Sequence, residues 1–187
     1  MSEAPSAKRF RYDFTARTLH WAMAAIIFAA IALGIYTSYL PPGTGPRPAL
    51  LDIHKSLGLT ALVLIVFRIV YRLARGEPPY REPPRFLSHM AAKLAHAGLY
   101  GLMLFMPVTG YLYSAAGGYS LPWFGLISWP RLATPDKPLS LSGQHLHHIG
   151  AWSIAALLVA HVLAVIWHRW IKKDEVLARM LPSSKPS

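Results

Sequence analysis

Residues 143–171 read GQHLHHIGAWSIAALLVAHVLAVIWHRWI, and this stretch decides the fold. It is too long and too apolar for an ordinary soluble helix, and it fits a bilayer span, which needs about 20 residues. At about 100° per residue, His147 and His161 lie about 40° apart around such a helix and roughly 21 Å apart along it. Two imidazoles at different depths of one membrane helix indicate two stacked metal centres. Haem iron is the strongest candidate metal, because histidine is one of its common axial ligands.

The other apolar residues of the chain gather in three further blocks, and the chain as a whole is 53% hydrophobic over 187 residues. We therefore expect an all-α membrane protein, a four-transmembrane-helix bundle that forms one domain over residues 1–187. The expected spans cover about residues 19–40, 51–73, 91–113 and 145–170, with proline- and glycine-rich breaks between them. The absence of cysteine excludes disulfides, iron–sulfur clusters and covalent haem attachment through a Cys-x-x-Cys-His motif.

The net charge of +11 is distributed unevenly between the two ends of these spans. One end carries only Arg47, Lys55, Arg131 and Lys137. Because basic residues concentrate on the cytoplasmic side, both termini are predicted to be cytoplasmic in a bacterial inner membrane, with residues 1–12 a retained tail. We interpret the charge as a topology signal and an attraction to anionic lipid, and not as a nucleic-acid site. The other end carries Lys8, Arg9, Arg11, Arg17, Arg68, Arg72, Arg75, Arg81, Arg85, Lys93, Arg169, Lys172, Lys173, Arg179 and Lys185.

This orientation assigns a depth to each histidine of the spans. His20 opens the first span at the cytoplasmic side, while His54 and His147 open the second and fourth spans at the outer side. His161 lies deeper, towards the cytoplasm. The depths match His54 with His147 and His20 with His161, which predicts a bundle that holds an outer and an inner bis-histidine haem. Two imidazole ligands leave no open position for oxygen, so such centres favour electron transfer.

Two of these four ligands have rivals in the sequence. His148 directly follows His147. His168 lies seven residues after His161 on the same helix face. We prefer His161 because His168 stands among aromatic and basic residues, where the helix meets the lipid headgroups.

Further residues have candidate supporting roles. Arg17 and Arg68 near the cytoplasmic boundary, and Lys55 beside His54, are candidates for binding a haem propionate or another anion. The alternative is that they snorkel to lipid phosphate. His96 and Trp123 are candidate quinone-site residues. The aromatic loop around Trp123 is interpreted as an interfacial anchor, or as a lid over a redox centre or quinone pocket.

Several short motifs together resemble the bacterial cytochrome b561 family of the inner membrane, over nearly the whole chain. At the start of span four that family has a single histidine after an aromatic residue, whereas this chain has three histidines within four positions, so His148 stays a rival of His147. The matching pieces are Thr18-Leu19-His20-Trp21, Ile53-His54 with Gly58, Leu94-Ala95-His96, Pro107 to Gly110, Pro122-Trp123-Phe124, His147 with His161, Lys173-Asp174, and Arg179-Met180-Leu181-Pro182.

The resemblance implies two non-covalent b-type haems and exchange of electrons with ubiquinone. The best-understood branch of the family is similar to a superoxide oxidase, which takes an electron from superoxide at the outer surface and reduces ubiquinone. We therefore predict an oxidoreductase of this kind, without assigning a catalytic residue beyond the haem ligands. One alternative is the cytochrome b electron-transfer subunit of a periplasmic hydrogenase or dehydrogenase. An alternative of another class is a haem or metal transporter.

Overall fold

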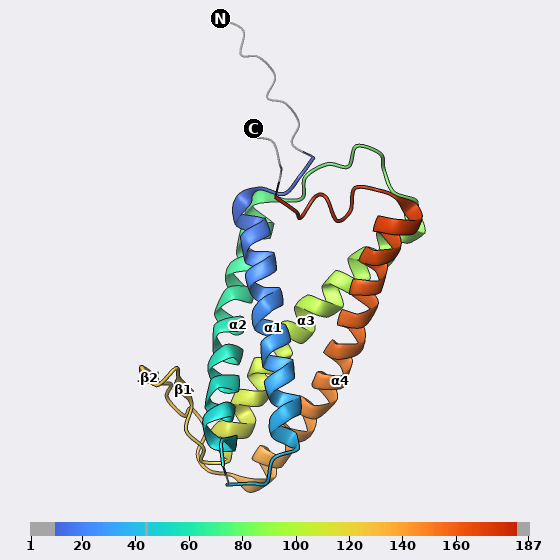
Figure 1. The fold of residues 1–187 in the computed structure, drawn as a ribbon. Helices are drawn as coiled ribbons and strands as arrows, with labels where there is room; N and C mark the ends of the chain where they lie inside the picture. The colour runs from blue at the N-terminus through green and yellow to red at the C-terminus, as the bar shows by residue number, and fades with distance from the viewer. Residues whose placement is uncertain (1–9, 44, 183–187) are drawn as a thin grey trace, which may run out of the picture.

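Four long helices run side by side in the computed structural model, which describes residues 10–43 and 45–182 (Figure 1). Each of the four is long and apolar enough to cross a membrane. The predicted all-α fold with four membrane-spanning helices is therefore confirmed. In chain order the elements are α1 (Phe14–Ser38), α2 (Arg47–Arg75), α3 (Phe86–Ala116), β1 (Pro122–Trp123), β2 (Ile127–Ser128), α4 (Lys137–Trp167) and the π-helical turn η1 (His168–Lys172).

All four helices begin earlier than the expected spans, and aspartates cap two of them. Asp13 accepts a hydrogen bond from the Ala16 amide at 2.8 Å, so α1 begins ahead of residue 19. Asp136 accepts one from the Leu139 amide at 2.9 Å, and α4 begins well ahead of residue 145. The residues just before the expected fourth span, from Lys137 on, are therefore helical and do not form a loop.

Helices α3 and α4 pack against each other with almost no side chain between their backbones at one level. A Cβ added to Gly143 would lie 2.7 Å from the backbone nitrogen of Tyr113, so only glycine fits there. Close approach through small residues is a common mode of helix association in membranes. Helix α1 packs on α2 in the same antiparallel manner, and α2 and α3 join the two pairs (Figure 1).

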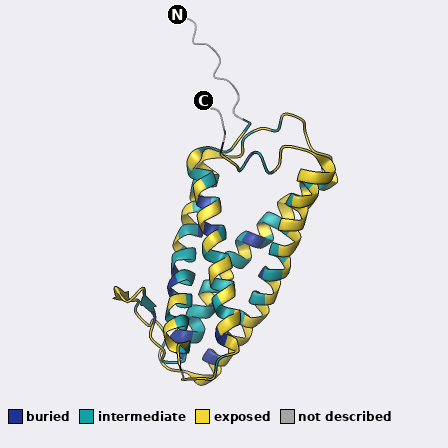
Figure 2. Cartoon of the chain, in the orientation of Figure 1, coloured by how far each residue is buried: buried dark blue, intermediate teal, exposed yellow. Residues whose placement is uncertain are grey.

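Apolar side chains cover the outer faces of the bundle, whereas few lie inside it. Leu73, Trp152 and Leu94 are 81%, 77% and 67% exposed, which suits a lipid solvent and not water. Figure 2 shows that few positions along the helices are buried and that most are intermediate or exposed. The bilayer therefore takes the role that a large apolar core has in a soluble protein.

The described ends of the chain meet at one end of the bundle (Figure 1). The Tyr12 amide donates to the carbonyl of Arg179 at 3.2 Å, and Trp21 Nε1 donates to the carbonyl of Met180 at 2.9 Å. The described ends of the chain thus lie at the same end of the bundle, and the cytoplasmic location of both termini stays a prediction made from basic residues. Lys8, Arg9 and Lys185, which contributed to that prediction, lie outside the described residues.

The loop at the opposite end contains a small hairpin that the sequence did not predict. Strands β1 and β2 pair antiparallel, with Pro122 opposite Ser128. The hairpin lies beside α2, on the side that faces away from the other helices (Figure 1). Ser56 of α2 holds it there, because its hydroxyl accepts from the Phe124 amide at 2.9 Å. The same hydroxyl lies 2.6 Å from the Asp52 carbonyl of its own helix and 3.1 Å from the Pro122 carbonyl, and it shares its one proton between them.

Candidate functional site

Two pairs of histidine rings face each other, one towards each end of the bundle. His54 of α2 and His147 of α4 have ring centroids 6.1 Å apart, with the ring planes at 85°. His20 of α1 and His161 of α4 have centroids 6.5 Å apart, with the planes at 61°. The structure therefore brings together the residues that the depth argument pairs.

These separations fit one metal ion between two imidazoles. A bond of about 2 Å from metal to ring nitrogen on each side places the two ring centres roughly 6 Å apart. No group of three or more histidine and acidic side chains able to hold a metal ion occurs within residues 10–43 and 45–182. A metal that brings its own equatorial ligands, as haem iron does, therefore fits the two-histidine sites better than a bare ion.

The outer pair is oriented by backbone carbonyls. Nδ1 of His54 lies 2.9 Å from the carbonyl oxygen of Ala30, and Nδ1 of His147 lies 3.0 Å from that of Met106. A carbonyl only accepts hydrogen bonds, so both Nδ1 atoms carry the proton and each Nε2 keeps a free lone pair. This is the arrangement in which a histidine binds a metal through Nε2.

A glycine allows the neighbouring helix to lie against one of these rings. A Cβ on Gly110 of α3 would lie 3.0 Å from Cε1 of His147. Since that separation is tighter than ordinary van der Waals contact, a larger residue would displace the ring. The outer site is thus fixed both by hydrogen bonds and by packing.

The inner pair has different surroundings. Arg68 Nη2 lies 3.4 Å from Nδ1 of His20, and a guanidinium only donates, so this Nδ1 accepts. The neutral ring then carries its proton on Nε2, and ligation through Nε2 requires Arg68 to release the contact. The ring of His161 makes no hydrogen bond to any residue that the structure describes, and the ring of His96 lies beside it with centroids 5.6 Å apart.

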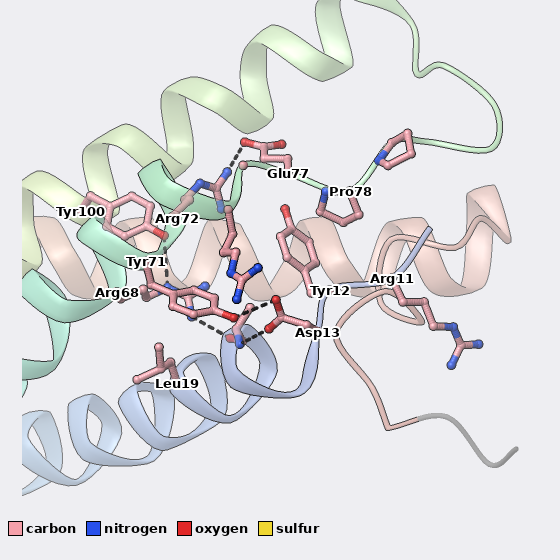
Figure 3. Close-up of a pocket in the computed structure, with 14 residues that line it drawn as sticks. Arg11, Tyr12, Asp13, Leu19, Arg68, Tyr71, Arg72, Glu77, Pro78 and Tyr100 are labelled. Carbon is pink, nitrogen blue, oxygen red and sulfur yellow. Dashed lines mark hydrogen bonds and ion pairs between the residues drawn. The ribbon is translucent and has the colours of Figure 1, made fainter. Parts of the chain in front are cut away.

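A cavity of about 330 Å³ lies at the end of the bundle where the described ends of the chain meet, and Arg68, which contacts His20, is one of its lining residues (Figure 3). Four arginines and two carboxylates line it, so its lining carries excess positive charge. Arg68 crosses it, donating to the Tyr100 hydroxyl and to the Ala16 carbonyl, each at 3.1 Å. Carboxylates and phosphates are the groups that such an arginine cluster recognises. The charged residues of the lining are Arg11, Asp13, Arg68, Arg72, Arg75 and Glu77.

Two titratable groups of this cavity precede the membrane-spanning helices. Burial raises the pKa of the Tyr12 hydroxyl, which outweighs the opposing effect of Arg72, so Tyr12 stays neutral. Burial also opposes ionisation of Asp13. Hydrogen bonds from the Ala16 amide and the Tyr71 hydroxyl outweigh it and hold the pKa of Asp13 below its usual value. Asp13 is therefore ionised and already satisfied, and Glu77 is paired with Arg72. Neither carboxylate of the lining forms an ion pair with Arg11, Arg68 or Arg75.

The other predicted anion ligands lie elsewhere. Arg17 Nη1 donates to the carbonyl of Leu181 at 2.8 Å, which ties it to the C-terminal segment. Lys55 Nζ lies 3.3 Å from Asp52 Oδ1 and donates to the Ser120 carbonyl at 3.0 Å, beside the hairpin loop. Of the three candidates, only Arg68 joins a histidine of the pairs to a cavity.

Neither rival histidine makes a ring contact with the two pairs in the part of the chain that the structure describes. His148 is exposed on α4. Nδ1 of His168 lies 2.5 Å from Asp174 Oδ2, beyond the end of α4. Trp123, a candidate quinone-site residue, donates from Nε1 to Thr60 Oγ1 at 3.0 Å on the hairpin side of α2. That position favours the interpretation of the aromatic loop as an interfacial anchor over that of a lid.

The sequence of this chain is similar to those of several known proteins and matches one family model. Residues 11–183 match the family model described as prokaryotic cytochrome b561. The chain is 32% identical over 177 residues to "Cytochrome b561 homolog 2" of Escherichia coli K12, covering 93% of each chain. It is 29% identical over 178 residues to "Cytochrome b561 homolog 1" of the same organism, covering 94% of this chain and 99% of that one. It is 30% identical over 173 residues to "Probable superoxide oxidase CybB" of Yersinia pestis, covering 89% and 93%.

Proposed function

Because the chain belongs to the prokaryotic cytochrome b561 family, we propose that it carries electrons between superoxide and ubiquinone through two b-type haems. The observation that carries this proposal is the two facing histidine pairs at different depths of one membrane bundle. Membership of a cytochrome b family implies b-type haem, and the number of pairs supports two of them.

The ligands follow from the pairs. His54 and His147 would hold the outer haem, and His20 and His161 would hold the inner one. When bound, haem supplies one-electron redox chemistry. The protein would supply imidazole nitrogens, a dry apolar surrounding and fixed positions for the two sites. Two imidazole ligands at each site would leave no position open for oxygen and would favour transfer of single electrons.

Arg68 is the residue best placed to bind a propionate of the inner haem. It lies between His20 and the arginine-lined cavity, and carboxylate is a preferred partner of guanidinium. When Arg68 turns to such a carboxylate, Nδ1 of His20 becomes free to carry the proton, and Nε2 becomes free to bind a metal. Arg17 and Lys55 stay predictions for the same role.

The outer end is proposed to meet superoxide. Positive charge at this end would steer an anion towards the outer site. It comes from Lys55, Arg47, Arg131 and Lys137. Each of two superoxide ions loses one electron and becomes oxygen, and ubiquinone takes up both electrons with two protons. The relative named a probable superoxide oxidase supports this assignment. His96 and Trp123 stay predictions for the quinone site.

Rapid mixing of the haem-loaded protein with superoxide tests this function. We expect superoxide to reduce the haems, with a rate that falls as salt concentration rises, because the attraction to the outer charges is screened. Added ubiquinone should then reoxidise them, and superoxide dismutase should abolish the first step. Haems that dithionite reduces but superoxide does not would contradict the superoxide assignment and favour the electron-transfer subunit of a periplasmic enzyme. Failure of ubiquinone to reoxidise them would contradict the quinone assignment.

A further inference from the structure

His96 of α3 lies against the ring of His161 of α4, although it belongs to neither of the two histidine pairs. The ring centroids are 5.6 Å apart, with the ring planes at 61°. His96 is half-buried on the inward side of α3. An imidazole in such a place needs a polar partner, because an unpaired buried polar group is costly.

His161 differs from the other three proposed ligands because its Nδ1 contacts no hydrogen-bond partner among the residues that the structure describes. Nδ1 of His54 and of His147 each contact a backbone carbonyl, and Nδ1 of His20 contacts Arg68. A histidine that binds a metal almost always donates its second N–H to an acceptor, which fixes the ring and strengthens it as a ligand. Within residues 10–43 and 45–182, His161 has no such bond, and the ring contacts recorded for it are those with His20 and His96.

Close packing of α3 on α4 keeps the two rings together. Gly98 lies two residues after His96, and a Cβ there would lie 2.9 Å from Cδ2 of Leu157, one turn before His161. Side chains of α4 thus lie directly against the backbone of α3 beside the two rings. We therefore interpret His96 as a packed neighbour of His161 and keep His20 as the partner of His161 across the inner site.

We propose that His96 is a positioning residue for the inner site, accepting a hydrogen bond from Nδ1–H of His161 directly or through one water. A neutral imidazole has one accepting nitrogen, so His96 is chemically suited to this role. The bond would hold the His161 ring and make its Nε2 a stronger electron donor. Because a stronger donor stabilises oxidised iron, His96 would lower the reduction potential of the inner haem. The inference rests on the proposed function.

Redox titration of the purified, haem-loaded protein tests this inference, with haem per chain measured on the same samples. The variants are His96→Ala, which removes the acceptor, and His96→Gln, whose amide oxygen replaces it. His89→Ala is the matched control, since His89 lies on the same helix but contacts Tyr80. The variant His54→Ala, which is expected to keep only the inner haem, identifies the potential that belongs to it.

We expect His96→Ala to shift the inner potential to more positive values and to leave the outer potential unchanged. His96→Gln should restore most of the shift, and His89→Ala should move neither potential. If His96→Ala loses the inner haem, the inference still requires His96→Gln to retain it, and loss in both variants overturns it. Unchanged potentials in a two-haem His96→Ala protein would also overturn it. A parent protein without haem would instead contradict the proposed function.

Discussion

Replacing His161 with alanine should leave one haem per chain instead of two. The inner site then keeps only one of its two imidazole ligands, that of His20. With one axial ligand lost, the haem should exchange into lipid or detergent. His168→Ala is the matched control, because it removes the rival histidine at the other end of the same face. It should keep both haems, since His168 is paired with Asp174 beyond the end of α4.

The same logic applies to the outer site. His54→Ala and His147→Ala should each remove the outer haem and keep the inner one, whereas His148→Ala should keep both, because His148 is exposed. Haem content from the pyridine haemochrome, measured with the reduced spectrum, distinguishes these cases. An inner haem that survives His161→Ala but disappears in His168→Ala would show that the inner ligand is His168.

Replacing Gly143 with valine should produce the largest loss of stability. A Cβ at this position would lie 2.7 Å from the backbone nitrogen and 3.1 Å from the Cα of Tyr113. The backbone of α3, here in its last turn, cannot yield as a flexible side chain does, so the helices must separate. Overpacking of this kind costs about 1–3 kcal/mol and occasionally more. Because His147 follows one turn later on α4, the outer haem should be lost as well.

Gly101→Val is the control for this prediction. Gly101 lies in α3 and is exposed, and a Cβ there would meet nothing within 4 Å. Both variants carry the same helix propensity cost, so the difference between them reports the contact with Tyr113. Thermal unfolding of the purified proteins in detergent, followed by size-exclusion chromatography, gives the comparison. Equal unfolding temperatures would mean that the α3–α4 contact does not hold the bundle together.

The helices were predictable because hydropathy and proline- and glycine-rich breaks are local signals. The early start of α4 was missed, although Asp136 carries a cap signal, because the first turns of the helix are polar and hydropathy does not mark them. The hairpin was missed for another reason. Its two strands have two residues each, and it is held by Ser56, a residue far away in the sequence.

The histidine pairs were predictable because helix rise and charge asymmetry together assign depths. What fixes the rings was not predictable from the sequence. The carbonyls of Ala30 and Met106 orient the outer pair, and every residue has a carbonyl, so no residue type marks them. The contact between His161 and His96 was not predictable from the sequence either, because it depends on how α3 and α4 pack.

The measurement that tests the account most directly is the haem content of the purified protein, together with its oxidised and dithionite-reduced spectra. The two histidine pairs predict two b-type haems per chain, both six-coordinate in both redox states. Haem that stays well below this ratio after expression with abundant haem, or a centre with an open coordination position, would contradict the assignment of the pairs as axial ligands.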